Sequence, residues 1–181
     1  MALLEIITYG HPILEKCAED IKEIADDVRQ LAKDMIYTMY AHNGVGLAAT
    51  QIGVLKRLVV VDVNQKDTKS EAQVFINPAI FEYSKEKEPF KEGCLSFPEI
   101  EVEIIRPKTI KMRWKDLDGK SYEQNLDGLL ARVLQHEIDH IDGVVFVKRM
   151  SRIKKTVLAP KLNKLKKETV KKFGLKKGKG K

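Results

Sequence analysis

Two stretches of the chain repeat apolar residues at intervals of three and four, which is the spacing of an amphipathic helix. The first covers Ile24–Met39 and is followed by the turn His42–Gly44. The second covers Leu129–Ile141, with Asp127 available as its N-cap and Gly143 marking its end. The pattern therefore predicts two helices separated by about half of the chain.

Between these helices, short runs of β-branched and aromatic residues alternate with turn residues, which indicates strands. Asp118-Gly119 is a hairpin signal between the last two runs. Strands joined by such short turns pair antiparallel, so we predict an α+β fold with antiparallel or mixed sheets packed around the second helix. The predicted strands are Arg57–Val63, Val74–Pro78, Val102–Ile105, Thr109–Trp114 and Ser121–Asn125, with a polar loop at Asn64–Glu71.

The pattern weakens after the second helix. Val144–Val147 predicts one more short strand, and the apolar residues beyond it are scattered among lysines. Pro160 is expected to interrupt a helix in this region, because it lacks an N–H group and its ring clashes with the preceding turn. The tip GLKKGKGK has no core residues and is expected to be disordered.

Charge divides the chain near the same place. Fifteen of the 33 Lys and Arg residues, but only one of the 26 acidic residues, lie from Lys148 onward. The net charge is therefore about −7 on the body and about +14 on the remainder, which points to an acidic partner for the latter. We interpret 1–147 as one folded domain and 148–181 as a basic, partly helical C-terminal extension.

Composition also indicates whether the protein is folded and whether it enters a membrane. Hydrophobic residues make up 43% and charged residues 33%, which is typical of a folded chain. No segment is apolar over the length of a membrane span, and the N-terminus lacks the pattern of an export signal. We therefore predict a soluble, cytoplasmic protein without membrane contact, in which Cys17 and Cys94 are free thiols.

The segment QHEIDH, Gln135–His140, carries the clearest candidate chemistry. Residues four apart lie on the same face of a helix, so His136 and His140 can direct their ring nitrogens at one ion. Glu137 lies beside that axis, where a carboxylate can exchange a proton with water at the ion. The alternative is an ordinary polar helix face with two surface histidines.

A catalytic metal site needs a third protein ligand. A histidine six residues after His140 would complete one known pattern, but Phe146 stands there. Glu168 is the only glutamate beyond His140 and is one candidate. Cys94, in the loop Lys91–Pro98, is the other, because a thiolate suits a borderline divalent ion. The spacing by itself leaves both candidates open.

Three segments together resemble the signature motifs of the peptide deformylase family. They are Gly44–Gln51 (GVGLAATQ), Glu92–Ser96 (EGCLS) and Gln135–His140 (QHEIDH), and they follow one another in the family's order. The resemblance implies that 1–147 is a metal-dependent catalytic domain. It implies a hydrolase that removes the N-formyl group from N-formylmethionyl peptides of nascent proteins and releases formate.

The resemblance also implies a ligand set and a mechanism. Cys94, His136 and His140 would hold one divalent ion, Fe²⁺ in the cell and Zn²⁺, Ni²⁺ or Co²⁺ in purified protein. Gln51 and the backbone N–H of Leu95 would stabilise the oxyanion of the tetrahedral intermediate. Glu137 would act first as base and then as acid.

The substrate and the ligands need supporting residues as well. By resemblance Gly46 presents backbone to the substrate chain, and the apolar positions near the histidines would hold the methionine side chain. Carboxylates often orient ligating histidines, so Glu92 and Asp139 are candidates for that role, with Glu92 able to pair with Arg106. The expected pocket residues are Val45, Gly46, Leu129 and Val133.

Deformylases act on chains leaving the ribosome, so the resemblance suggests ribosomal RNA as the acidic partner of the extension. We expect a monomer. Two other functions remain open at this point. One is a zinc endopeptidase with Glu168 as third ligand, and the other is a nucleic-acid-binding protein in which a metal only braces the fold.

Overall fold

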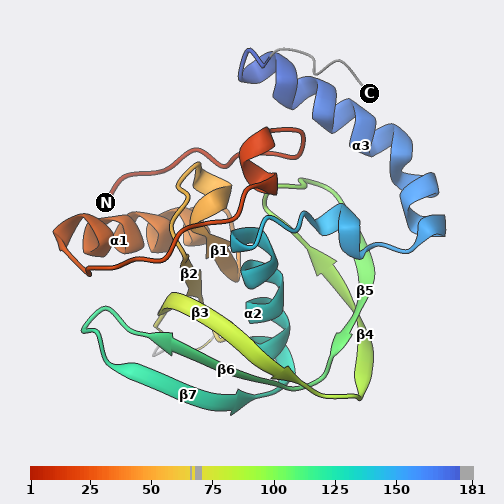
Figure 1. The fold of residues 1–181 in the computed structure, drawn as a ribbon. Coiled ribbons are helices and arrows are strands. Elements are labelled where there is room, and N and C mark those ends of the chain that lie inside the picture. Colours follow the sequence, from red (N-terminus) through yellow and green to blue (C-terminus); the bar gives the residue numbers. More distant parts are fainter. Residues whose placement is uncertain (66, 68–70, 176–181) are drawn as a thin grey trace.

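The computed structural model describes residues 1–65, 67 and 71–175. It contains three α-helices, three short 3-10 helices and seven strands in this part of the chain (Figure 1). In chain order they are η1 (Pro12–Glu15), α1 (Asp26–Ala41), β1 (Gly46–Ala48), η2 (Ala49–Ile52), β2 (Leu58–Val61), β3 (Gln73–Tyr83), β4 (Lys87–Gly93), β5 (Glu101–Pro107), β6 (Ile110–Lys115), β7 (Ser121–Leu126), α2 (Gly128–Ile141), η3 (Phe146–Arg149) and α3 (Arg152–Lys172).

The strands form two antiparallel sheets. One has five strands in the order β1-β2-β3-β6-β7, and the other is the β4-β5 pair. Figure 1 shows α2 lying between the five-stranded sheet and the β4-β5 pair. The predicted α+β fold with strands packed around this helix is confirmed.

Helix α2 lies at the centre of the fold and is buried along most of its length. Each residue from Ala131 to Ile141 is buried, and its apolar members share one core cluster with Val59, Phe75 and Met112 of the large sheet. The large sheet supplies apolar neighbours on one side of the helix, and Glu92 and Arg106 of the β4-β5 pair supply hydrogen-bond partners for its buried polar residues on the other. Asp127 occupies the N-cap position as expected, but its side chain makes no capping hydrogen bond.

Helix α1 covers the other face of the large sheet. Val28, Ala32, Met35 and Met39 of α1 pack with Leu58 and Val60 of β2 in a second cluster. Strand β2 is therefore buried on both faces, which explains why its sequence is an unbroken apolar run and not an alternating one.

Strand β3 is longer than predicted. The prediction ends it at Pro78, yet β3 continues to Tyr83. The pairing with β6 shifts register between Ile76 and Ala79, so Pro78 lies in a bulge where no ladder N–H is required. Asn77 has a φ of 50° there, and its side-chain amide bonds both backbone groups of Ile21 at 2.8 and 2.9 Å.

Two expectations about local structure are wrong, and one strand was not predicted. Val144–Val147 is not a strand, because the chain turns into η3, which buries Phe146 in the core. Pro160 does not end a helix, since α3 runs through it with the proline on an exposed face, where water can satisfy the freed carbonyl. Strand β4 was missed, because Lys87–Gly93 is too polar to be read as a strand.

Helix α3 packs against the N-terminal segment and the segment that follows β4 (Figure 1). Leu162 and Leu165 join a core cluster with Leu14 and Phe97, and Thr169 forms a 2.6 Å hydrogen bond with Thr8. Most of the basic extension is thus part of the folded body. The predicted disordered tip lies outside the described residues from position 176 onward, as does part of the predicted polar loop.

No helix in the described part of the chain has the length and apolar character needed to cross a membrane.

The packing of α3 predicts a stability difference between its two apolar faces. Leu162→Ala should lower the free energy of unfolding by about 2–3 kcal/mol, because it leaves a cavity in the core. Val157→Ala is the matched control, since Val157 is 71% exposed and should change the free energy of unfolding by less than about 0.5 kcal/mol. Urea denaturation measures both, and equal values would contradict the docking of α3.

Candidate active site

Helix α2 and the loop after β4 bring together three side chains that could hold a metal ion. One potential ligand atom from each of Cys94, His136 and His140 lies within 4.8 Å of the other two. The Sγ atom of Cys94 is 3.1 Å from Nε2 of His140. The histidines are one helical turn apart, and their ring centroids are 5.0 Å apart. The sequence-predicted cluster is therefore assembled from two elements 42 or more residues apart.

A buried carboxylate fixes the orientation of His136. The ring Nδ1 lies 3.0 Å from Oε2 of Glu92, so a proton on Nδ1 leaves Nε2 free to bind an ion. Burial alone would raise the pKa of Glu92, but hydrogen bonds from His136 and Arg106 outweigh it and lower that pKa to about 2. Glu92 is thus an anion at neutral pH and a constant acceptor for the ring.

The electrostatics of the cluster favour a bound cation. Burial by itself lowers the pKa of His136, but the negative charge of Cys94, together with Glu92, raises it to about 10. The space between these side chains therefore stabilises positive charge. Burial and the neighbouring His136 hold the pKa of His140 well below its usual range, so His140 is the neutral imidazole that metal binding requires.

The donor set also fits a metal. One thiolate and two imidazoles suit borderline divalent ions such as Zn²⁺ or Fe²⁺, and three protein ligands leave a position for a reactant. This part of the chain can therefore hold one metal ion.

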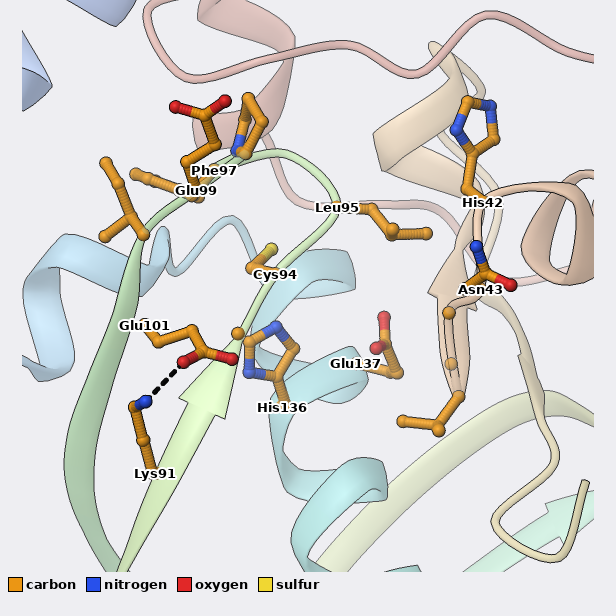
Figure 2. A pocket seen from close by; sticks show the side chains of 16 residues that line it. His42, Asn43, Lys91, Cys94, Leu95, Phe97, Glu99, Glu101, His136 and Glu137 are labelled. Carbon is orange, nitrogen blue, oxygen red and sulfur yellow. Dashed lines mark ion pairs between the residues drawn. The ribbon is translucent and has the colours of Figure 1, made fainter. Parts of the chain in front are cut away.

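Glu137 faces the same space from α2. Its Oε2 atom is buried and has no hydrogen-bond partner among the described residues. Burial raises the pKa of Glu137 to about 7, so its carboxyl group can both take up and release a proton near neutrality. Figure 2 shows Cys94, His136 and Glu137 projecting toward one another from the loop and the helix.

Gln51 reaches the site from η2 with a fixed amide orientation. Its Oε1 atom accepts a hydrogen bond from the backbone N–H of Ala48 at 2.8 Å. Its Nε2 atom consequently faces the other way, 3.2 Å from Oγ of Ser96 and 3.6 Å from Sγ of Cys94. The side chain thus points an N–H donor at the ligand cluster.

Two cavities open onto this cluster. The larger, of about 830 Å³, is walled by the segment 42–46 on one side and by the segment after β4 on the other (Figure 2). A smaller cavity of about 260 Å³ adjoins it and is mostly apolar. The smaller one is lined by Val45, Phe90, Leu129 and Val133, together with His136 and Glu137.

Comparison with known proteins agrees with this geometry. The family model described as polypeptide deformylase matches residues 3–156. The chain belongs to the polypeptide deformylase family. It is 42% identical to the peptide deformylase of Novosphingobium aromaticivorans over 92% of this chain and 99% of that one.

Solved deformylase structures share the fold. A mutant form of Arabidopsis thaliana peptide deformylase 1B has a TM-score of 0.91 and 34% identity, covering 97% of this chain and 96% of that one. The Thermotoga maritima peptide deformylase has a TM-score of 0.79 and 41% identity, covering 83% and 99%. The predicted activity, a hydrolase that removes the N-formyl group from nascent peptides, is confirmed.

The alternative third ligand lies elsewhere in the structure. Glu168 is on α3, has a side chain 61% exposed, and pairs with Lys164 at 3.8 Å. It takes no part in the cluster around His136 and His140. The deformylase family and this placement together leave no support for the zinc endopeptidase.

Sequence reasoning missed several residues of the deformylase site. Arg132 donates to Glu92 at 3.0 Å, and the ring of Phe146 packs 5.4 Å from the ring of His136. Phe90 lines the smaller cavity although it lies on a strand that the pattern did not predict. A buried arginine on the apolar helix pattern was the one available signal, because such a side chain needs an acidic partner.

The close approach of β1 to α2 makes Gly46 a test of the site. A Cβ atom at Gly46 would lie 2.6 Å from Oε1 of Glu137 and 2.8 Å from Cγ1 of Val133. Gly46→Ala should therefore displace Glu137 or β1 and lower kcat/KM for a formyl peptide by about a hundredfold. Metal content should stay near that of the native protein, because Cys94, His136 and His140 are untouched. Full activity in the variant would contradict the close contact.

Proposed function

We propose that Cys94, His136 and His140 hold one divalent ion and that Glu137 moves the proton during deformylation. The observation that carries this proposal is the convergence of the three ligand atoms within 4.8 Å, beside a buried carboxylate oxygen without a partner in the described part of the chain. When bound, the ion supplies Lewis acidity toward the formyl carbonyl and the attacking water.

The proposal includes the identity of the ion. A single thiolate with two imidazoles does not discriminate strongly between first-row divalent ions, so availability decides which one is bound. We propose Fe²⁺ in the cell and Zn²⁺, Ni²⁺ or Co²⁺ where these replace it during purification.

Glu137 carries the proton through the reaction. Its carboxylate takes a proton from the attacking water, which adds to the formyl carbon. The protonated Glu137 then gives this proton to the nitrogen of the leaving peptide as the C–N bond breaks, releasing formate and a free amino terminus. A pKa near 7 suits both steps, because the same group has to gain and lose the proton at one pH.

Two N–H donors stabilise the negative charge that develops on the formyl oxygen. The Nε2 group of Gln51 is already aimed at the cluster by the hydrogen bond that its Oε1 accepts from Ala48. The backbone N–H of Leu95, next to Cys94, is the second donor. Such preorganised donors need no rearrangement as charge develops, which is why they lower the barrier.

The methionine side chain of the substrate fits the smaller cavity. Val45 and Leu129 are each 42% exposed despite their apolar character, so they line a surface that a ligand can cover and do not serve only as core. Val133 closes the floor, and Gly46 presents its backbone to the substrate chain. Phe90, which the sequence did not suggest, completes the apolar wall.

Glu92 and Asp139 hold the His136 ring in position through hydrogen bonds. Glu92 accepts from the His136 ring, and Asp139 accepts from Arg106 at 2.7 Å. Arg106 in turn donates to Glu92 at 2.8 Å, as the sequence suggested. Both carboxylates therefore support the position of His136, and Asp139 does so from outside both substrate cavities.

We further propose that the extension 148–181 contacts ribosomal RNA near the exit of the nascent chain. Leu162, Leu165 and Thr169 anchor α3 to the body, so its many lysines lie on the faces that remain exposed. Lysines held on a docked helix attract the phosphates of RNA, and their binding releases counterions from the RNA. The enzyme would act there as a cytoplasmic monomer, with 1–147 as its catalytic domain.

Two substitutions separate the roles of metal ligand and proton carrier. Cys94→Ser should lose most of the metal, whereas Glu137→Gln should keep it and lower kcat by about 10²–10⁴-fold. Glu168→Ala is the control and should leave both properties unchanged. Metal is counted per chain by atomic emission, and formate release is measured from formyl-Met-Ala-Ser. Retained metal in Cys94→Ser would sink the proposed ligand set.

Charge reversal on α3 tests the ribosome contact. Replacing three exposed lysines of α3 by Glu should weaken co-sedimentation with ribosomes by about tenfold or more and flatten its dependence on salt. Formate release from a free peptide should not change. The substituted residues are Lys161, Lys164 and Lys167.

The control has the same change in net charge on the body. If it weakens ribosome binding as strongly as the α3 variant, the contact is a general effect of charge and the proposal fails. The control residues, also exposed, are Lys22, Lys85 and Lys115.

A further inference from the structure

A chain of hydrogen bonds leads from His136 away from the substrate cavity and ends at Arg149. Glu92 accepts from the His136 ring at 3.0 Å and from Nε of Arg106 at 2.8 Å. The NH1 group of Arg106 donates to Oδ2 of Asp139 at 2.7 Å. Arg149 donates through Nε to the same Asp139 oxygen at 2.9 Å, and through its NH2 group to the other oxygen.

This last pair differs from an ordinary surface ion pair. Arg149 is half-exposed, with 46% of its side chain accessible, but Asp139 is only 12% and Arg106 only 5% exposed. Arg149 donates two hydrogen bonds to Asp139, and together they contact both carboxylate oxygens. This bidentate arrangement fixes the plane of the carboxylate. Isolated ion pairs on the surface contribute little to stability because both side chains are free to move. Here Asp139 is buried and held by Arg106, so Arg149 binds a fixed partner.

The segment that carries Arg149 also touches His136 directly. Phe146, the first residue of η3, packs its ring 5.4 Å from the His136 ring. Arg149 is the last residue of the same η3. A four-residue element therefore contacts the histidine on one side and the end of its hydrogen-bond chain on the other.

We infer that Arg149 is a positioning residue that orients the ring of His136. Arg149 fixes both oxygens of Asp139, and Asp139 holds the NH1 group of Arg106. Arg106 then presents its Nε and NH2 groups to Glu92, which is the acceptor of the ring proton. The inference rests on the proposed role of His136 as a ligand, and it assigns to Arg149 a role that its distance from the substrate cavities would not suggest.

Loss of Arg149 should weaken metal binding only moderately, because Glu92 has a second hydrogen-bond donor besides Arg106. Arg132 also donates to Glu92, at 3.0 Å, so Glu92 keeps part of its position when Asp139 turns. Loss of a partner behind a metal ligand usually weakens metal binding by about 10–100-fold. Arg149 should lie near the lower limit, about tenfold.

The experiment uses the full chain loaded with Co²⁺. Arg149→Met removes the charge and the donors but keeps an unbranched side chain as far as the position of Nε. Co²⁺ affinity is measured by competition with a chelator, ligand geometry by the visible absorption of the Co²⁺ form, and kcat and KM with formyl-Met-Ala-Ser. We expect about tenfold weaker Co²⁺ binding, an altered spectrum and a lower kcat, with KM unchanged because Arg149 lines neither substrate cavity.

Arg57 offers a second arginine–aspartate pair as a control near the C-terminal end of α2; its side chain is 17% exposed and also donates to the carbonyl of Pro78 at 2.9 Å. Its NH1 group donates to Asp142 at 2.6 Å, just beyond the last residue of the helix, and no hydrogen bond connects this pair with His136 among the described residues. Arg57→Met should leave Co²⁺ affinity and the spectrum unchanged. Arg149→Lys keeps the charge without the two-pronged geometry and should recover part of the loss.

Two outcomes would overturn the inference. Co²⁺ affinity and spectrum within about twofold of the native values in Arg149→Met overturn the inference, because a lost supporting partner should cost more. An equal loss in Arg57→Met overturns it as well. If Arg149→Met does not fold, the comparison of Arg149→Lys with Arg57→Lys decides in the same way. A Cys94→Ser protein that keeps Co²⁺ would contradict the proposed ligand set, which is a separate failure.

Discussion

The burial of the Glu92 carboxylate is the interaction on which the rest of the site depends. Arg106 and Arg132 each donate to it, and the His136 ring lies within hydrogen-bond distance. An unpaired carboxylate at this depth would be too costly to keep ionised, so its partners are necessary for the fold as well as for the chemistry. Because the partners come from β5 and α2, the same contacts join the small sheet to the central helix.

A second constraint is steric. Strand β1 passes so close to α2 that only a glycine fits at position 46, with Glu137 and Val133 directly opposite. This closeness places the Glu137 carboxylate beside the strand along which the substrate is proposed to lie. Proximity of backbone and carboxylate limits the positions open to a bound peptide, which favours attack at one carbonyl.

The basic extension is part of this architecture and not an appendage. Its α3 helix adds Leu162 and Leu165 to the cluster that holds Phe97, and Phe97 lies in the loop that carries Cys94. The path from the proposed ribosome contact to the ligand loop therefore runs through packed side chains. The same helix leaves its lysines exposed, so one element combines a structural face with a charged face.

The sequence by itself determined which side chains could do the chemistry. Spacing of four placed His136 and His140 on one helix face, and the three motifs identified the family and the fold. Local pattern also predicted α1, α2 and most strands of the large sheet, because burial on one or two faces leaves a periodic or unbroken apolar signal.

Tertiary structure decided what local pattern does not encode. Strand β4 is polar yet forms because β5 pairs with it, α3 continues through Pro160 because its apolar face is docked, and β3 continues past Pro78 because a bulge removes the need for an N–H. The partners of Glu92 and the approach of Cys94 to the histidines depend on contacts distant in sequence. Such contacts are set by how the two sheets enclose α2, and no local periodicity records that arrangement.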